Sequence, residues 1–232
     1  MSKLYLALLL LFFVFSTERL LAQHNSQFYF FSVKDIQTIK LTAKSNWGKL
    51  IVKGLRDKIK ECESSGMDVP NTGGSYIHNY FCPVHNIQFT FSWNSPLSHY
   101  CEVCKKSWTD EKKYDDAWIA IAHGKNLEYL VANMYLYLIT DSSGYALNIK
   151  NMLLKYSMAY PLYTEHNRDR IATDHYSGKM YSQSLDDAVW AIDAARAYDV
   201  ARPVMTEKEK SAIVFSFLNN MIRNFFRQMK YT

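Results

Sequence analysis

The sequence lacks three features that would place it in common classes of protein. After residue 22, no segment is apolar for the about 20 residues that a transmembrane helix needs, so we expect no stable membrane span once a leader is removed. The formal charge is only +5, and the lysines and arginines form no dense stripe, which argues against a nucleic-acid partner. Asp186 and Asp187 are adjacent at an expected helix start and point apart, unlike the carboxylate pair of a glycosidase.

The first 22 residues have the pattern of a signal peptide. Lys3 precedes an unbroken apolar run at 4–15, and Ala22 supplies a small residue before the expected cleavage at Gln23. The run is too short for a comfortable membrane span. We therefore expect a periplasmic or secreted protein with a signal peptide at 1–22, an N-terminal linker at 23–44 and a helical domain at 45–232.

Two short cysteine motifs stand at the centre of the chain, within residues 76–104. Cys82-Pro83-Val84-His85 and Cys101-Glu102-Val103-Cys104 are separated by fifteen residues, a spacing typical of two metal-binding knuckles joined by a hairpin. The expected site is a structural Zn²⁺ held by Cys82, His85, Cys101 and Cys104. Four protein ligands leave no open position for a substrate or an activated water, so the site should stabilise the fold rather than catalyse a reaction.

Other arrangements of this motif remain open. In an oxidising compartment Cys82 could form a disulfide with Cys101 or Cys104, or the thiols could stay free and buried. His78 and His99 are close enough in sequence to be alternative ligands.

Between the two motifs, the sequence alternates between apolar and polar residues. Ile87, Phe89, Phe91 and Trp93 recur with a period of two, which predicts a half-buried strand that ends at Asn94-Ser95-Pro96. No strand is predicted after Trp93.

Helical periodicity dominates the rest of the chain. Helices are predicted at 47–62, 118–139, 145–160 and 185–202 and from residue 206 to near the end. The first should bury Trp47, Leu50 and Ile51 on one face and carry Cys62 as an unpaired residue. Gly124 is expected to bend the second helix or split off its first turns.

Smaller signals set the helix boundaries. Ser184 is expected to cap the helix at 185–202, and Thr206 with Glu209 forms a capping box for the last helix. Trp118 and Trp190 fall on inward helical positions and are expected in the core. Successive antiparallel helices with short connections predict stacked helical hairpins.

Several pieces of the chain resemble one family of enzymes. They are Gly73-Gly74-Ser75-Tyr76-Ile77-His78-Asn79-Tyr80-Phe81-Cys82-Pro83-Val84-His85, Tyr114-Asp115-Asp116-Ala117-Trp118, Leu138-Ile139-Thr140-Asp141 with Tyr145-Ala146, and residues 181–190 running to Ala197-Tyr198-Asp199. Together they resemble the N-terminal region of the heparinase II/III-like polysaccharide lyases, relatives of the alginate lyases. The resemblance covers residues 45–225.

The resemblance implies a mainly α fold, an incomplete α/α toroid with a small zinc-knuckle β-hairpin insertion. It also implies β-eliminative cleavage of acidic, uronate-containing polysaccharides. In the family, a catalytic Asn-His pair and tyrosine lie beyond the position equivalent to Phe225, and this chain has no matching pair; His166-Asn167 is reversed. We therefore expect an inactive N-terminal fragment of a secreted lyase. The alternative is a non-catalytic, zinc-stapled helical module that binds acidic glycans.

The connection between the helices at 145–160 and 185–202 is the candidate substrate-binding segment. It combines cations that can meet carboxylates with flat rings that can stack on sugars. The predicted substrate-binding residues are Arg168, Arg170, His175, Tyr176, Tyr181 and Gln183. The competing interpretation is an ordinary solvated loop with tyrosines packed beneath it.

Overall fold

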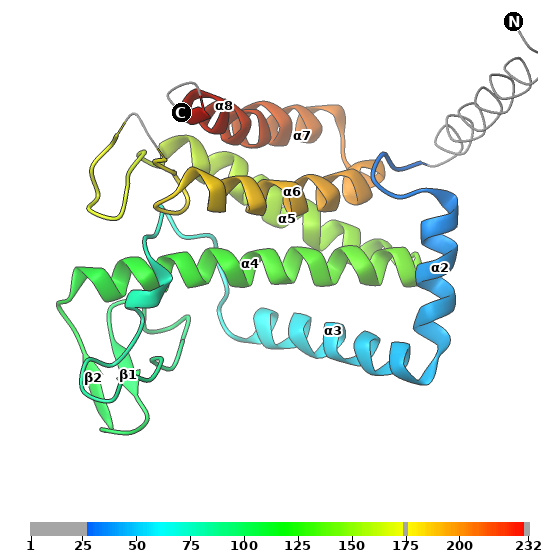
Figure 1. Ribbon diagram of the computed structural model, residues 1–232. Coiled ribbons are helices and arrows are strands. Elements are labelled where there is room, and N and C mark those ends of the chain that lie inside the picture. The colour runs from blue at the N-terminus through cyan, green and yellow to red at the C-terminus, as the bar shows by residue number, and fades with distance from the viewer. Residues whose placement is uncertain (1–26, 174–175, 230–232) are drawn as a thin grey trace, which may run out of the picture.

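The computed structural model describes residues 27–173 and 176–229. The expected signal peptide and His175 lie outside the described residues. The described chain is mainly helical, with one small antiparallel sheet beside the helices (Figure 1). In the described ranges, no helix combines the length and the apolar character needed to cross a bilayer.

From α3 to α6 the helices run in alternating directions, α7 and α8 together run back along α6, and α2 lies across the ends of α3 and α4 (Figure 1). In chain order the α-helices are α2 (Val33–Lys44), α3 (Asn46–Ser64), α4 (Lys112–Thr140), α5 (Ser143–Ala159), α6 (Ser184–Ala201), α7 (Glu207–Ser211) and α8 (Asn219–Met229). A π-helical segment, Ala212–Leu218, joins α7 to α8. The predicted helices are therefore confirmed, and Thr206 and Glu209 form the predicted capping box.

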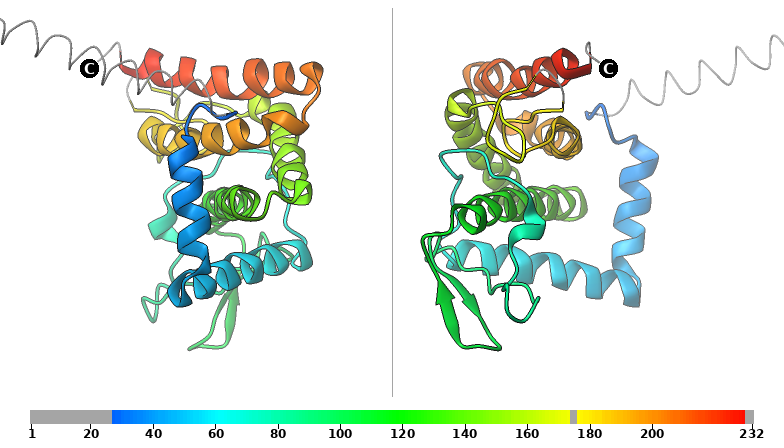
Figure 2. Two further views of the ribbon diagram at one scale, coloured as in Figure 1. Left: turned by 90° about the vertical axis from the view of Figure 1, so that its right-hand side faces the viewer. Right: turned by 60° about the vertical axis from the view of Figure 1, so that its left-hand side comes forward.

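Helix α4 is the central element of the fold, and α2, α3, α5 and α6 all pack against it (Figure 2). It begins at Lys112, before the predicted start at 118, and continues through Gly124 without interruption. A Cβ added at Gly124 would meet no atom closer than 3.9 Å, so the glycine is not required by a close contact. The expected bend or split at this position is wrong.

Two hydrophobic clusters meet on α4. Its first turns supply Tyr114, Ala117 and Trp118 to a cluster that also contains Phe89 and Cys101. Its later turns belong to the main core, which includes Trp190 of α6. Trp118 and Trp190 are both buried, as predicted, and each indole N–H donates to a backbone carbonyl.

The segment that we assigned to a linker contains helix α2. Ser32 and Asp35 form a complete capping box at its start, and Asp35 lies in the first turn, where a negative charge is favourable. Helix α2 packs against both α3 and α4. At the junction with α3, a Cβ on Gly48 would lie 1.9 Å from the Thr42 carbonyl oxygen, so the close approach of α2 and α3 at this bend requires glycine.

The first turns of α3 do not bury the apolar face that the sequence predicts. Trp47, Leu50 and Ile51 are 65%, 69% and 47% exposed, because α3 is covered mainly along its later turns, where Ile59 and Cys62 are buried. Cys62 is a free thiol, as expected.

The small sheet differs from the predicted strand. Residues 87–93 form only isolated bridges, Phe81 to Gln88 and Thr90 to Tyr100. The regular strands are β1 (His99–Cys101) and β2 (Lys106–Trp108), which pair antiparallel around the second cysteine motif. The expectation of no strand after Trp93 is therefore wrong: strands of three residues are too short to show a period of two, and the turn between them sets their register.

Candidate functional site

The structure brings the four predicted metal-binding residues together. One ligand atom from each of Cys82, His85, Cys101 and Cys104 lies within 4.8 Å of the other three. The Cys82 Sγ atom is 3.7 Å from Nδ1 of His85 and 4.0 Å from Sγ of Cys104, and Cys101 Sγ is 3.9 Å from the same His85 nitrogen. All four cysteines of the chain are free. The cluster could hold a metal ion.

The two motifs adopt the same local turn. Asn86 N–H donates to the Cys82 carbonyl at 2.8 Å, and Lys105 N–H donates to the Cys101 carbonyl at 2.9 Å. Asn86 and Lys105 both have positive φ, 50° and 57°. Each turn therefore closes four residues after its first cysteine and directs the two ligands of its motif to the same point.

The geometry and chemistry of the donors fit zinc. Tetrahedral Zn²⁺ with Zn–S bonds of about 2.3 Å places its sulfur ligands about 3.8 Å apart, close to the 4.0 Å between the Cys82 and Cys104 sulfurs. Burial opposes ionisation of Cys101, but hydrogen bonds from the backbone N–H groups of Cys104 and Val103 and from the neighbouring thiols lower its pKa to about 6, whereas burial and the contact with Cys101 raise the pKa of Cys104. Because metal ligands must be thiolates, the surroundings favour the binding form of Cys101 but not of Cys104.

The two alternative histidine ligands lie elsewhere. His99 is buried, with Nε2 2.8 Å from Asp115 Oδ1 and Nδ1 3.3 Å from the Tyr80 hydroxyl. Both of its ring nitrogens are occupied by these structural contacts. The ring of His78 lies 4.8 Å from that of Tyr76, outside the cluster.

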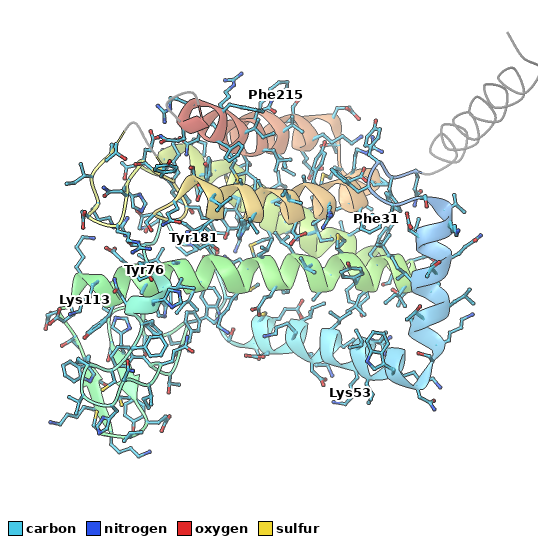
Figure 3. All side chains as sticks on the ribbon, in the orientation of Figure 1. Phe31, Lys53, Tyr76, Lys113, Tyr181 and Phe215 are labelled. Atoms are coloured by element: carbon cyan, nitrogen blue, oxygen red, sulfur yellow. The ribbon has the colours of Figure 1, made fainter. Side chains whose placement is uncertain are left out.

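A cleft of about 520 Å³, which none of the four cluster residues lines, joins distant parts of the chain. Residues 75–78, around the short helix η1 (Ile77–Asn79), form one wall, and the connection before α6 together with the start of α6 forms another. Tyr76 and Tyr181 belong to these two walls (Figure 3). Of the predicted substrate-binding residues, the cleft contains Arg168, Tyr181 and Gln183.

Two glycines allow the cleft segments to approach. A Cβ on Gly73 would lie 1.8 Å from the Lys179 carbonyl oxygen, and one on Gly74 would lie 2.2 Å from the backbone nitrogen of Ala120 in α4. Gly74 N–H donates to the Met180 carbonyl at 2.8 Å. The Gly73-Gly74 pair thus binds the wall at residues 75–78 to both α4 and the opposite wall.

The carboxylate of Asp187, in the first turn of α6, holds the segment that leads into this helix. It accepts hydrogen bonds from the backbone N–H groups of Lys179, Met180 and Tyr181. This contact replaces the predicted Ser184 cap, since the N-cap position is Gln183 and it makes no capping hydrogen bond. The neighbouring Asp186 lines the cleft, and burial raises its pKa although the charge of Arg168 opposes the shift.

Arg168 is the exposed cation of the cleft. Its guanidinium carbon lies 3.7 Å from the centre of the Tyr76 ring, a cation–π contact, and no carboxylate in the described chain forms an ion pair with it. An arginine on an aromatic platform retains its N–H donors for an acidic ligand.

Arg170 is bound to other parts of the fold, unlike Arg168. Its Nε donates to Asp116 Oδ2 at 2.8 Å, a second guanidinium nitrogen contacts the other carboxylate oxygen, and the third donates to the Gly73 carbonyl. Asp116 is 6% exposed. With its donors directed into the protein, Arg170 makes structural contacts, and it is not among the residues that line the cleft. Its part in substrate binding stays a prediction. Tyr176, at φ 61°, is exposed and does not line this cleft.

The cleft also contains residues that the sequence prediction omitted. Tyr76, His78 and Asp186 line it together with the predicted residues. Tyr76 and His78 belong to the Gly-Gly-Ser-Tyr-Ile-His stretch that carries the resemblance. Their position beside two glycines was the feature of the sequence that could have indicated a place in the cleft. Asp186 was visible only as a first-turn helix residue.

Comparison with known proteins gives partial matches. No protein-family model matches the chain. Over 91 residues, 39% of the chain, it is 30% identical to an alginate lyase of Stenotrophomonas maltophilia (strain K279a) and 29% identical to an exo-oligoalginate lyase of Saccharophagus degradans. Each match covers 12% of the relative, so the chain spans a small part of the length of these curated proteins. The similarities support a relationship to polysaccharide lyases.

Proposed function

We propose that this chain forms the glycan-binding cleft of an exported polysaccharide lyase of the heparinase II/III-like type, which acts on uronate-containing glycans. The observation that carries the proposal is the cleft in which Arg168 lies on Tyr76 of the facing wall, with Tyr181 and Gln183 in the same lining. Partial similarity to two alginate lyases supports the same class of ligand. In this proposal the helical hairpins are part of an α/α toroid, and the protein acts in the periplasm or outside the cell.

The residues of the cleft match the chemistry of an acidic sugar. The Arg168 guanidinium can form two parallel hydrogen bonds with a carboxylate, and the tyrosine ring beneath it limits its movement. Gln183 adds an amide that can donate to or accept from sugar hydroxyls. Asp186 lines the same cleft and repels a ligand carboxylate placed close to it, so the ligand should bind with its carboxylate toward Arg168 and away from Asp186.

The Cys/His cluster would support this cleft as a structural zinc site. Three residues separate the wall at residues 75–78 from the first cysteine motif. The ion would hold Cys82 and His85 against Cys101 and Cys104, and these residues would supply thiolate and imidazole ligands. No step of glycan chemistry involves the ion in this proposal.

We expect binding without cleavage by the chain alone. β-Elimination needs a base that removes the C5 proton and an acid that protonates the leaving oxygen. His78, Tyr76 and Tyr181 line the cleft, but the Tyr76 ring lies beneath Arg168 and in contact with His78, and burial and the charge of Asp187 raise the pKa of Tyr181. His123 and Tyr156 are hydrogen-bonded at 2.9 Å, but both are fully buried, and burial lowers the pKa of His123 to about 3. These positions favour the second candidate function, a module that binds acidic glycans without cleaving them.

The proposal is tested by calorimetric titration of the purified chain with oligomannuronate and with a neutral oligosaccharide of equal length. We expect binding of the acidic oligomer only, weakened about tenfold or more by Arg168→Gln, since a hydrogen bond to a charged group contributes about 1.5–3 kcal/mol. Arg196→Gln, which changes an exposed arginine on α6 paired with Asp193, is the matched control and should bind as the original chain does. Equal affinity in Arg168→Gln would contradict the assignment of the cleft.

A further inference from the structure

The segment between α5 and α6 also lines a second pocket. It has a volume of about 590 Å³ and is lined by five residues of the connection before α6 and four residues of α8. The connection lies at the same end of the molecule as the end of α8 (Figure 1). Its lining shares no residue with the cleft that contains Arg168.

The charges of this pocket are predominantly positive. Lys179, Arg223 and Arg227 line it, and Glu165 is the acidic residue among its lining residues. Glu165 is already neutralised, because Arg227 forms an ion pair with it and Gln228 donates to its other oxygen. Two cations therefore remain available to a ligand.

Neither of these two cations has a carboxylate partner in residues 27–173 and 176–229. Arg223 is exposed and makes no ion pair or hydrogen bond there. The Nζ atom of Lys179 lies 5.5 Å from the centre of the Tyr160 ring, a cation–π contact that leaves its N–H donors free. A pocket with two uncompensated cations attracts anions.

A buried amide adds a directional donor. Asn224 is 5% exposed, and its Oδ1 accepts a hydrogen bond from Arg227 at 2.9 Å. Its Nδ2 is buried and has no hydrogen-bond partner in the described chain. The ion pair of Arg227 with Glu165 fixes the guanidinium that orients this amide, and Asn224 is one of the residues that line the pocket. Its Nδ2 atom is covered in this structure, so a ligand reaches it after a small movement of the side chains around it. Buried donors normally have partners, and an unpaired one indicates a missing acceptor.

We propose that this pocket is a binding site for an oxyanion, a carboxylate, sulfate or phosphate group, held by Arg223, Lys179 and the Nδ2 group of Asn224. Among the described lining residues, two cations without a carboxylate partner and a neutralised Glu165 favour an anion over a metal cation as the ligand. A planar or tetrahedral oxyanion offers several acceptor atoms and can reach an arginine, a lysine and an amide together. This site is independent of the proposed glycan cleft, since either could exist without the other.

The test is a titration of the ¹⁵N-labelled chain with sodium sulfate, inorganic phosphate and sodium glucuronate, each against sodium chloride at equal ionic strength. We expect at least one of the three oxyanions to shift the Asn224 side-chain amide signal in a saturable way, with a stoichiometry of one. The strongest of the three identifies the group that the pocket prefers.

Three variants make the test specific. Arg223→Gln should weaken oxyanion binding roughly tenfold or more, because it removes a charged donor without breaking any contact of the folded chain. Arg196→Gln, another exposed helical arginine, and Arg168→Gln, in the glycan cleft, should leave it unchanged. The proposal is overturned if none of the three oxyanions saturates, or if Arg223→Gln binds the oxyanion as tightly as Arg196→Gln does. Loss of glycan binding in Arg168→Gln with oxyanion binding retained separates the two sites.

Discussion

Replacing Arg170 with glutamine should destabilise the whole protein. Arg170 forms a bidentate ion pair with Asp116, whose side chain is 8% exposed, while 22% of the Arg170 side chain is exposed. Removing one partner of a buried pair costs about 3–5 kcal/mol, because the remaining charge is left buried without that partner. Since Arg170 is partly exposed and Lys112 still contacts the carboxylate, we expect no more than the lower end, about 3 kcal/mol.

Urea unfolding followed by circular dichroism measures this loss directly. For a chain of this size about 3 kcal/mol corresponds to a fall in melting temperature of roughly 6–12 °C. Lys112→Gln is the matched control: Lys112 contacts the same carboxylate at 3.0 Å, but 72% of its side chain is exposed, so the loss should be about 1 kcal/mol or less.

Comparing Arg168→Gln with Arg170→Gln tests the ligand-binding role of the first arginine and the structural role of the second. Arg168→Gln should leave the urea midpoint nearly unchanged and weaken glycan binding, whereas Arg170→Gln should lower the midpoint and leave the affinity of the remaining folded molecules largely intact. If Arg170→Gln unfolds at the same urea concentration as the original chain but loses the glycan, Arg170 is a ligand-binding residue, and its structural role is refuted.

Three further outcomes follow from the structure. Metal analysis should find about one zinc per chain, lost in Cys104→Ser and retained in Cys62→Ser; an unchanged metal content and melting curve in Cys104→Ser would exclude a structural ion. Burial raises the pKa of Asp116, but hydrogen bonds from Arg170 and Lys112 outweigh burial and hold that pKa below its ordinary value of about 3.9. The stabilisation from this carboxylate should be complete above about pH 4 and fall as the pH drops through the lowered pKa. In urea titrations at several pH values, Asp116→Asn should remove that part of the acid dependence. Incubation with alginate should produce no rise in the absorbance of unsaturated uronates, and a clear rise would overturn the expectation that the chain alone does not cleave.

The local parts of the candidate site could be predicted from the sequence. Cys82 and His85 lie within one turn, as do Cys101 and Cys104, so their spacing shows which atoms can meet. Helix α2 carried a comparable local signal, since Ser32 is followed three residues later by Asp35, but the prediction assigned this segment to a linker.

The non-local parts could not be predicted in the same way. Nothing near Arg170 in the sequence indicates that its partner is Asp116 on α4, and the same residue type two positions earlier has a free guanidinium. The exposure of Trp47, Leu50 and Ile51 could not be predicted either, because periodicity shows which residues share a helix face but not whether a neighbouring element covers that face.

Helix α4 also determines how the molecule should come apart. At about 1.5 Å per residue its 29 residues extend for about 43 Å, and the aromatic cluster beside the cysteine motifs and the main helical core both include residues of this one helix. Neither core can lose its share of α4 without disturbing the other. Backbone amides along both halves should therefore exchange with deuterium through one shared opening event, with similar protection at Trp118 and Leu136.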